Sequence, residues 1–418
     1  MITNPLQRKK VLQAYTDALN SVRGDVCVQN YLQSEQFKLR LNATEKIAIL
    51  AMGKAAQSMA QGAYAVLNEN IKSGLVITKQ DHLSAGLKID YFDYFESSHP
   101  IPSEQSLIAG KKVIDFVSGL ATDTHLIVLI SGGTSALVEQ LKPCVNLGEL
   151  IQVNDWLMAS GLAIEVMNRI RQKLSMIKGG KLASFTTHLK VSNLLLSDVL
   201  SNDPAYIGSG LFVPVIGAKI EAPLPEWLEL ILEKCENFNS EIPGNNIYTA
   251  LVATNAQLLK NIADSCNPER HEKVFIIDTV LSGKVESEAG KIVTKVLEGE
   301  SGYYIWGGEP TVELSHCSGT IGQGGRNQHL ALLIANKIKT MKNIVVLCIG
   351  TDGTDGATED AGALVDGDTV LRAEGEGFDV EEYINSFNSA EFLHVSGDVI
   401  NTGPTGTNVM DVVIAYKW

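Results

Sequence analysis

Runs of apolar residues alternate with amphipathic stretches along most of this chain. "KIAILAMG", "SGLVIT", "HLIVLISGG" and "VSNLLLSD" are apolar almost without interruption, which is typical of strands buried on both faces of a parallel sheet. Between them, "KAAQSMAQGAYAVL" and "SEQSLIAGKKVIDFVSGL" show the periodicity of helices that pack one side on a core. The alternation predicts β-α-β units, with parallel strands and covering helices.

The pattern changes at residues 214–245, where Pro, Asn and Gly cluster, and a domain boundary is expected there. The predicted domains are 1–240, with a mainly parallel sheet, and 241–418, where "KVFIIDT" and "KVESEAGKIVTKVL" begin a second α/β series. In this second part "TVEL" alternates with period two, whereas "IVVLCIG" is apolar throughout. The second sheet is therefore expected to be mixed.

Composition and charge exclude several classes of protein. Of the 418 residues, 45% are hydrophobic and 20% are charged, as in a globular protein. The formal net charge of −14 argues against a nucleic-acid or anionic-membrane surface. No apolar run approaches the roughly 20 residues that span a bilayer, and the N-terminal stretch predicts an amphipathic helix rather than a secretion signal. We expect a cytoplasmic monomer or homodimer that acts on a small molecule.

The cysteines give no sign of a metal site. They stand at positions 27, 144, 235, 266, 317 and 348, too far apart for a metal knuckle or a CxxC motif. Buried free thiols in a reducing compartment are the simplest interpretation.

Glycine-rich turns follow several of the predicted strands. They are "AMGKAA" at 51–56, "SGGTSA" at 131–136, "WGGEPT" at 306–311, "GQGGRNQ" at 322–328 and "GTDGTDGATED" at 350–360. Glycine lets a backbone approach a ligand closely, and a strand-to-helix turn directs N–H groups at one point, so phosphate is the expected ligand. One turn alone would be an ordinary tight turn, but several together predict an anion site. None matches a Walker A motif or a complete GxGxxG after a strand.

Two cations stand in these turns. Lys54 follows Gly53 where a predicted strand gives way to a helix. A first-turn lysine faces the positive end of its helix, which favours a ligand-binding role over a merely solvated side chain. Arg326 stands after glycines where a loop opens another helix, and its planar guanidinium suits phosphate or carboxylate oxygens. A surface salt bridge is the alternative for Arg326.

Carboxylates also follow predicted strands. Asp352 and Asp355 lie in "GTDGTDG" after a buried strand, where short carboxylates suit Mg²⁺ or a base that takes a hydroxyl proton. The alternative is local capping of the loop, which we expect for at least one of the two. In "LLLSDVLSNDP" we favour Asp198 for the site and interpret Asp203, before a proline, as a turn former.

Two further loops carry polar candidates. Ser98 and His99 precede a helix whose cap is predicted to be Ser103 or Ser98, and a loop histidine is often only polar filler. "GTSAL" resembles a hydrolase nucleophile elbow, but Leu137 replaces its second glycine. We therefore interpret Ser135 as a hydrogen-bond donor rather than a nucleophile.

Nine motifs together resemble the glycerate 2-kinase family, whose members carry a C-terminal MOFRL domain and were long labelled hydroxypyruvate reductases. They are "AMGKAA", "SSHPIP", "SGGTSAL", "RQKLSMIKGGKLA", "LSDVLSNDP", "GGEPTV", "GGRNQ", "GTDGTDG" and "NTGPTGTN", in family order from about residue 50 to 411. The resemblance implies transfer of a phosphoryl group from ATP to the 2-hydroxyl of D-glycerate, with Mg²⁺. It also implies a Rossmann-like N-terminal domain, a second α/β domain, and an active site in the cleft between them.

The resemblance also assigns roles to five residues, since Lys54, Arg326, Asp198, Asp352 and Asn408 match functional positions of the family. The other candidates below come from the turns and loops already described. The residues expected to be catalytic are Lys54, Arg326, Asp198 and Asp352, of which Asp198 and Asp352 are also the candidate metal ligands. Those expected to bind substrate or nucleotide are Gly53, Ser98, His99, Ser131, Gly132, Gly133, Thr134, Ser135, Glu309, Thr311, Gly324, Gly325, Asn327, Asp355 and Asn408. Which carboxylate is the base stays open.

The chain departs from the family pattern at a few positions. His329 stands where an acidic residue is typical and could change the charge near Arg326, and Met410 interrupts "TNxxD" where a polar residue is common. Besides a kinase, a nicotinamide-dependent hydroxypyruvate reductase and a non-catalytic nucleotide-binding regulator remain alternatives. The lack of a complete dinucleotide motif speaks against the reductase. Cations and acids on separate glycine loops speak against the regulator.

Overall fold

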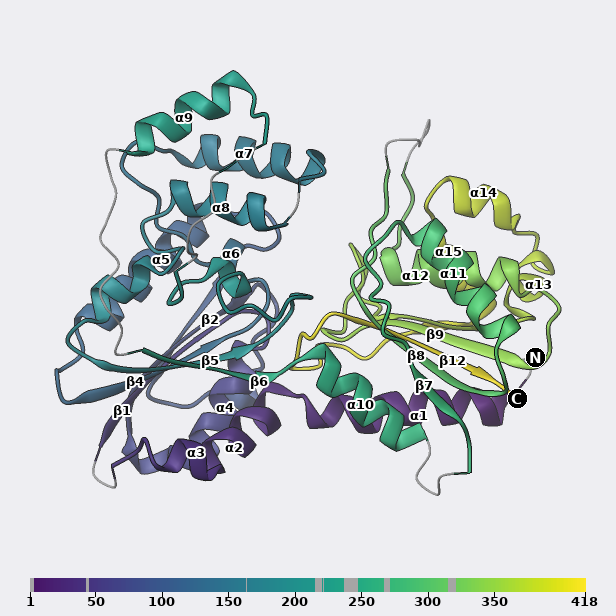
Figure 1. Ribbon diagram of the computed structural model, residues 1–418, viewed down its shortest axis with the longest axis horizontal. Coiled ribbons are helices and arrows are strands. Elements are labelled where there is room, and N and C mark those ends of the chain that lie inside the picture. Colours follow the sequence, from purple (N-terminus) through teal and green to yellow (C-terminus); the bar gives the residue numbers. More distant parts are fainter. Residues whose placement is uncertain are drawn as a thin grey trace. The chain divides into compact units, whose positions relative to one another are not determined.

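The computed structural model describes residues 4–42, 45–162, 164–214, 220, 222–236, 247–266, 271–314 and 321–418. The chain divides into two compact units. Arg23–Ala253 form the parallel-sheet unit, and Met1–Val22 together with Thr254–Trp418 form the mixed-sheet unit. Each unit is a sheet with helices on both faces (Figure 1). The α/β fold class predicted from the sequence is confirmed.

The parallel-sheet unit is built on a six-stranded sheet in the order β3-β2-β1-β4-β5-β6, in which each pair of neighbours is parallel. Helices cover both faces, which accounts for the apolar runs. The strands are β1 (Lys46–Met52), β2 (Ile71–Lys79), β3 (Phe92–Ser97), β4 (Thr124–Ile130), β5 (Lys190–Leu196) and β6 (Ile247–Ala253). Strand order reverses between β1 and β4, so the carboxyl ends of these strands flank the switch point at which open α/β sheets bind ligands.

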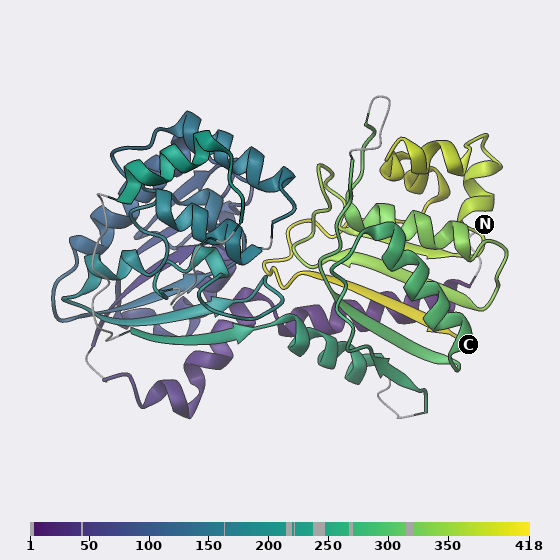
Figure 2. The same ribbon diagram turned by 45° about the horizontal axis from the view of Figure 1, so that its top comes forward.

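The helices of this unit lie in two layers (Figures 1 and 2). On one face are α2 (Gly24–Gln33), α3 (Glu35–Lys38) and α4 (Ala56–Leu67); on the other are α5 (Glu104–Ser118), α6 (Thr134–Leu137), α7 (Leu147–Ala159), α8 (Ile164–Leu174) and α9 (Glu226–Glu236). Short 3-10 turns are η1 (Asn68–Asn70), η2 (Ala85–Leu87), η3 (Lys181–Thr186) and η4 (Ile207–Ser209). The helices α7, α8 and α9 share a small core of their own, to which Leu150, Leu174 and Leu228 belong.

The second sheet is mixed, as predicted. Its order is β11-β10-β9-β12-β8-β7, with antiparallel pairs except for parallel β7 and β8. The strands are β7 (Val274–Ile276), β8 (Gly302–Gly308), β9 (Ile344–Gly350), β10 (Gly362–Asp366), β11 (Val399–Ile400) and β12 (Asp411–Lys417). "TVEL" does not form a strand: Thr311 makes a single bridge to Lys284, and residues 312–314 have no regular structure.

Helices cover both faces of the mixed sheet (Figure 1). One layer holds α11 (Val285–Glu298), α12 (Arg326–Lys337), α13 (Thr369–Glu374), α14 (Val380–Asn385) and α15 (Ser389–Ser396); the other holds α1 (Pro5–Ser21) and α10 (Asn255–Cys266). The amphipathic N-terminal helix buries Val11, Tyr15, Ala18 and Leu19 there.

The division between the units differs from the predicted one at 240/241. The first 22 residues belong with the C-terminal sheet, because α1 packs on α10, β9 and β12. Residues 247–253 belong with the N-terminal sheet, because β6 pairs with β5. Residues 215–219, 221 and 237–246 of the Pro- and Asn-rich stretch lie outside the described part of the chain.

Buried charges attach α1 to the mixed sheet. Arg8 contacts Asp366 and Asp398 at 2.8 Å each. Arg372 of α13 bonds the same two carboxylates, at 3.1 and 2.6 Å. Both aspartate side chains are fully buried, so each carboxylate depends on the two arginines for its charge balance.

We expect Arg8→Met to lower the free energy of unfolding by about 2 kcal/mol, because hydrogen bonds to charged groups contribute about 1.5–3 kcal/mol while Arg372 still pairs with both carboxylates. Urea titration measures the change. The control is Lys9→Met on the exposed side of the same helix, which should change stability by less than about 0.5 kcal/mol. Equal unfolding midpoints for R8M and the wild type would contradict the assignment.

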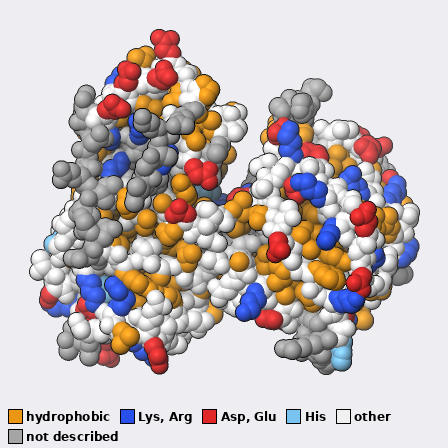
Figure 3. All heavy atoms as spheres, viewed as in Figure 1, with side chains coloured by type: hydrophobic (Ala, Val, Ile, Leu, Met, Phe, Trp, Pro, Cys, Tyr) orange, Lys and Arg blue, Asp and Glu red, His pale blue; other side chains and the backbone are white. Residues whose placement is uncertain are grey.

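The surface carries charges of both signs. On the face drawn in Figure 3, Lys and Arg side chains of the described residues are interspersed with Asp and Glu. The described helices include none with an apolar stretch long enough to cross a bilayer. Cys27, Cys144, Cys235, Cys266 and Cys348 are free thiols; position 317 is outside the described residues.

Candidate functional site

Two of the predicted glycine turns form one structure at the switch point of the parallel sheet. Gly53 and Lys54 follow β1, and Ser131 begins the turn after β4. The Ser131 N–H donates to the Met52 carbonyl at 3.0 Å, and the Lys54 N–H donates to the Gly132 carbonyl at 2.9 Å. The ends of β1 and β4 are therefore joined where the fold places a ligand.

Glycine is required at position 53. Its φ is +118°, and a Cβ would lie 2.2 Å from the Ser131 hydroxyl. That hydroxyl accepts the Ala55 N–H at 3.0 Å. Ser131 therefore fixes the turn from within, and its side chain is fully buried.

Gly133 brings three predicted site residues together. It has a φ of +86°, and a Cβ there would lie 3.1 Å from His99 Cδ2 and 3.3 Å from Lys54 Cγ. The N–H groups of Thr134 and Ser135 open the turn of α6 and so have no partner within it. Backbone donors, the aliphatic part of a lysine and an imidazole thus gather beside one half-buried glycine, an arrangement suited to an anion.

The remaining polar residues of this turn support it. Thr134 Oγ1 donates to the Ser131 carbonyl at 2.7 Å. The Ser135 hydroxyl lies 2.7 Å from that of Ser209, which donates to Asn168 of α8 at 3.1 Å. The Ser135 hydroxyl thus shares a hydrogen bond with another serine.

The loop before α5 was predicted to provide Ser98 and His99. Ser103 is the cap of α5: its hydroxyl accepts the Gln105 N–H at 3.1 Å. The Ser98 hydroxyl lies 2.7 Å from that of Ser103. Ser98 is therefore bonded to the helix cap, whereas His99 lies beside Gly133.

Asp198 and Asp203 lie in different surroundings, and only the turn expected of Asp203 is seen directly. Asp198 follows Ser197 at the carboxyl end of β5 and is half-buried. Asp203 accepts the Ala205 N–H at 2.9 Å and forms a turn. Asp198 therefore lies at the same edge of the parallel sheet as the glycine turns, because β5, β1 and β4 all end there.

A buried ion pair next to this edge was missed by the sequence analysis. Lys178 Nζ lies 2.5 Å from Glu139 Oε2, and both side chains are inaccessible to solvent. Burial lowers the pKa of Lys178, while Glu139 opposes that change. Glu139 comes just after α6, so the pair joins the end of the glycine turn to the "IKGG" turn. A lysine inside that apolar stretch was the available signal.

In the mixed-sheet unit, Arg326 begins α12 and is held by two carboxylates. Its Nε and Nη2 contact Asp411 at 2.5 and 3.0 Å, and its Nη1 contacts Glu309 at 2.8 Å. The Arg326 side chain is 36% exposed to solvent. Three of its five N–H groups therefore fix the plane of the guanidinium, while the side chain still reaches solvent.

Asp411 was not among the predicted site residues. It is the first residue of β12, is 1% exposed and pairs with both Gly308 and Gly350. Tyr15 of α1 was also missed. Its buried hydroxyl has no partner among the described residues, and burial, together with nearby Asp352 and Asp411, raises its pKa.

Asp355 caps α12. Its two oxygens accept the N–H groups of Asn327 and Gln328 at 3.1 and 2.7 Å. Gly325 makes room for it, since a Cβ there would lie 2.2 Å from Asp355 Cγ. Asp352 accepts the Thr354 N–H at 3.1 Å and is half-buried. The predicted alternative of local capping of the loop thus holds for Asp352, whereas Asp355 caps α12, which lies far from it in the sequence.

Burial raises the pKa of the Asp355 carboxyl from 3.8 to about 7, against the opposing effect of the Gln328 and Asn327 N–H groups. The folded protein then keeps a proton that the unfolded chain releases near pH 4. The stability from this proton is complete below that pH and is lost as pH rises through about 7. We therefore expect the wild type to lose stability relative to Asp355→Asn between pH 5 and 8, as measured by urea unfolding at both values.

The control is Asp379→Asn. Asp379 accepts the N–H groups of Glu381 and Glu382 at the start of α14 but is exposed. Its variant should keep the pH slope of the wild type. Parallel slopes for the wild type and D355N would contradict a buried titrating group at position 355.

Other predicted residues shape the same loops. The backbone of Thr311 bonds Gly283 and Val285 while its side chain is exposed. Asn408 is half-buried in the loop before β12. A Cβ on Gly324 would lie 2.3 Å from the Ser389 hydroxyl.

His329 was expected to be able to change the charge near Arg326, and its surroundings argue against this. It is buried, and its ring lies 5.0 Å from that of Phe387. Burial lowers its pKa, so the imidazole is neutral at pH 7 and adds no charge near Arg326.

No group of three or more His, Cys, Asp or Glu side chains within the described ranges is arranged to hold a metal ion. Mg²⁺ in phosphoryl-transfer sites is commonly held by one or two carboxylates and by substrate phosphates. Single carboxylates such as Asp198 and Asp352 suit a Mg²⁺ ion that is held in this way, by few protein ligands and by the phosphates of the substrate.

Comparisons with known proteins cover both sets of turns. A family model described as a domain of unknown function, DUF4147, matches residues 10–222, and one described as the MOFRL family matches residues 302–411. A D-glycerate 2-kinase of Thermotoga maritima is 33% identical to this chain, over 97% of each. A glycerate 2-kinase of Pyrococcus horikoshii is 31% identical, over 97% of this chain and 94% of its own.

A solved structure agrees with these relatives. The crystal structure of glycerate kinase from Thermotoga maritima matches with a TM-score of 0.82 at 30% identity, over 99% of this chain and 100% of its own. The first family model spans the switch-point turns, and the second spans Glu309, Arg326 and Asp411. Because relatives at 33% and 31% identity match 97% of the chain and a solved glycerate kinase shares its fold, the chain belongs to the glycerate 2-kinase family.

Proposed function

We propose that this protein is a glycerate 2-kinase that transfers the γ-phosphoryl group of ATP to the 2-hydroxyl of D-glycerate. The observation that carries the proposal is similarity over nearly the whole chain to a D-glycerate 2-kinase. In the reaction, a bond forms between the 2-oxygen and the γ-phosphorus, the bond to ADP breaks, and the hydroxyl proton is released.

We assign the phosphate groups to the switch-point turns of the parallel-sheet unit. Gly133 leaves room for close approach, and Lys54 and His99 lie beside it. The backbone N–H groups of the turn after β4 can bind phosphate oxygens without a side chain of that turn, and the Lys54 ammonium adds a positive charge from the turn after β1.

We assign to Arg326 the neutralisation of charge on the transferring group. A loose phosphoryl-transfer transition state spreads charge over the equatorial oxygens, so fixed cations contribute more than a strong base. Asp411 and Glu309 support this role because they hold the guanidinium in one plane. Asp411 is then a positioning residue rather than a catalytic one.

Asp198 and Asp352 are proposed as the acidic residues of the reaction. Each follows a buried strand and is half-buried, and either suits Mg²⁺ or the hydroxyl proton. Bound Mg²⁺ would supply further neutralisation of the phosphate charge. Asp355 is assigned to the α12 cap instead, because its oxygens accept backbone N–H groups.

The test is ADP release from ATP, Mg²⁺ and D-glycerate, beside NADH oxidation with hydroxypyruvate. We expect ADP only when all three components are present. Phosphorus NMR identifies the product: a 2-phosphate couples to one carbon-bound proton and gives a doublet, whereas a 3-phosphate couples to two and gives a triplet. NADH oxidation without ADP release would support the reductase, and a triplet would move the transfer to the 3-hydroxyl.

A further inference from the structure

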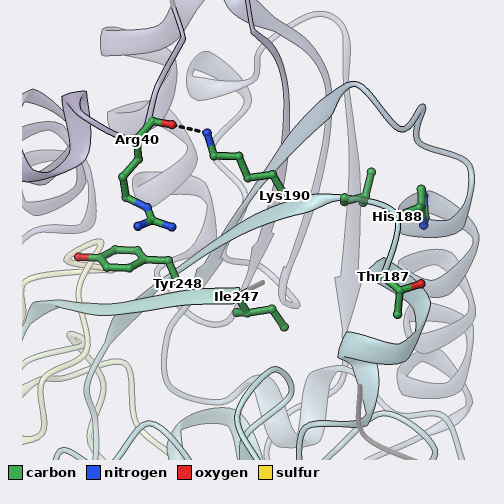
Figure 4. Close-up of a pocket in the computed structure, with 7 residues that line it drawn as sticks. Arg40, Thr187, His188, Lys190, Ile247 and Tyr248 are labelled. Carbon is green, nitrogen blue, oxygen red and sulfur yellow. Dashed lines mark hydrogen bonds between the residues drawn. The ribbon is translucent and has the colours of Figure 1, made fainter. Parts of the chain in front are cut away.

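A pocket opens at the opposite edge of the parallel sheet, where β5 and β6 begin (Figure 4). Its volume is about 570 Å³, and Arg40, Lys190 and Tyr248 line it. The seven residues of β5 rise about 3.3 Å each, which places this pocket about 20 Å from the switch point. It is therefore separate from the site described above.

Arg40 is held in place over an aromatic ring. Its guanidinium carbon lies 3.9 Å from the centre of the Tyr248 ring, as Figure 4 shows. The Tyr248 hydroxyl is itself fixed by Gln36 at 2.6 Å and by the Tyr31 hydroxyl at 2.5 Å. Stacking fixes the plane of the guanidinium and leaves its N–H edge for a ligand.

One donor of Arg40 is buried and unused. Its Nε has no hydrogen-bond partner among the described residues. A buried N–H is normally paired, and arginine offers its Nε–H and a terminal N–H as a fork that matches two oxygens of one phosphate or carboxylate. The unpaired donor therefore points to an anion.

The surroundings leave the pocket positive. Lys190 Nζ donates to the Arg40 carbonyl and contacts Glu45 at 3.0 Å, so Lys190 and Glu45 balance each other. The other Glu45 oxygen lies 3.2 Å from His125, whose pKa is lowered by burial. None of the described residues that line the pocket is acidic. The charge of Arg40 thus has no acidic counterpart among the described residues of the lining.

We propose that this pocket binds a small organic phosphate, with the phosphate on the Arg40 fork and Lys190 beside it. The volume falls in the range of sites for small organic ligands rather than single ions, and Leu189 and Ile247 provide apolar wall for the carbon part. A ligand there does not compete directly with one at the glycine turns. The proposal rests on these contacts and is independent of the reaction catalysed.

Calorimetric titration of the full-length protein with glycerol 3-phosphate tests the proposal, with inorganic phosphate and glycerol as further probes. We expect glycerol 3-phosphate to bind more tightly than inorganic phosphate, and glycerol not to bind. Arg40→Gln should weaken glycerol 3-phosphate at least about tenfold, because it removes the charge-assisted fork. The control is Lys88→Gln, which removes a cation 5.4 Å from another tyrosine ring, that of Tyr94, and should leave binding unchanged.

The same titration separates the two ends of the sheet. Lys54→Ala alters the switch point and should retain the Arg40-dependent binding. If R40Q does not fold, Arg40→Lys is used in its place, because it keeps the charge and removes only the planar fork. In NMR spectra, the Arg40 Nε–H signal, identified by its absence from R40K, should move with glycerol 3-phosphate. Binding that is unchanged in R40Q and R40K, or lost only in K54A, would overturn the proposal.

Discussion

Arg326→Lys should lower kcat at least about hundredfold, equivalent to about 2.7 kcal/mol of transition-state stabilisation, while KM for D-glycerate changes much less. Lysine keeps the charge but cannot reproduce a planar group that contacts Asp411 through two nitrogens and Glu309 through a third. If Arg326 neutralises charge that develops only in the transition state, ground-state binding is nearly untouched. Steady-state kinetics and melting temperature are measured on the same preparation.

Arg372→Lys is the matched control. Arg372 also bonds two buried carboxylates, Asp366 and Asp398, in the same unit, but it has no assigned part in the reaction. Its lysine variant should lower the melting temperature and leave kcat unchanged. If R326K behaves in the same way, with a lower melting temperature and near-normal turnover per folded molecule, Arg326 is structural only.

Gly133→Val should lower kcat/KM for ATP at least about hundredfold. A side chain at position 133 would meet His99 and Lys54 at 3.1 to 3.3 Å, and its branches would extend over the space where a phosphate approaches the backbone. Misplacement of binding groups by about 1 Å can cost this much. ADP affinity, measured by calorimetry, should fall with it.

Backbone strain has to be separated from that steric effect. Gly133 has a φ of +86° and Gly377 one of +91°, a region that costs other residues about 1–2 kcal/mol. A Cβ on Gly377 would have nothing within 4 Å. Gly377→Val therefore carries the strain alone and should keep full activity. Unchanged ADP affinity in a folded G133V would make the turn after β4 an ordinary one.

The sheet edge of the first unit was predictable from sequence because its strands are buried on both faces. The sequences of such strands are continuous apolar runs, and the residues that follow parallel strands meet at one edge of the sheet. That logic placed Lys54 and Gly133 in neighbouring turns. The short-range signal also limited the cap of α5 to Ser103 or Ser98, because a helix cap is decided within one turn of the chain, and the structure has Ser103 there.

The surroundings of Arg326 were not predictable in the same way. Its partner Asp411 is 85 positions away, and the contact depends on the register of β12 between β8 and β9. Asp355 could be interpreted as a ligand or a cap until α12 was placed against it. The position of Tyr15 near Asp352 and Asp411 was not predictable, because an amphipathic pattern shows that α1 packs on a core but does not show which core.

The position of α1 has a consequence for synthesis of the protein. The helix is made long before its partner, because Asp366, to which Arg8 bonds, comes 358 positions later. At about 5–20 residues per second, the ribosome takes about 20–70 s to reach Asp366. Until β9 and β12 have been made, the apolar side of α1, with Val11 and Tyr15, lacks the strands on which it packs. The parallel-sheet unit can fold meanwhile, since its residues are contiguous, but the other unit must wait for its last strand. We therefore expect α1 to be the stretch of the nascent chain that chaperones bind longest.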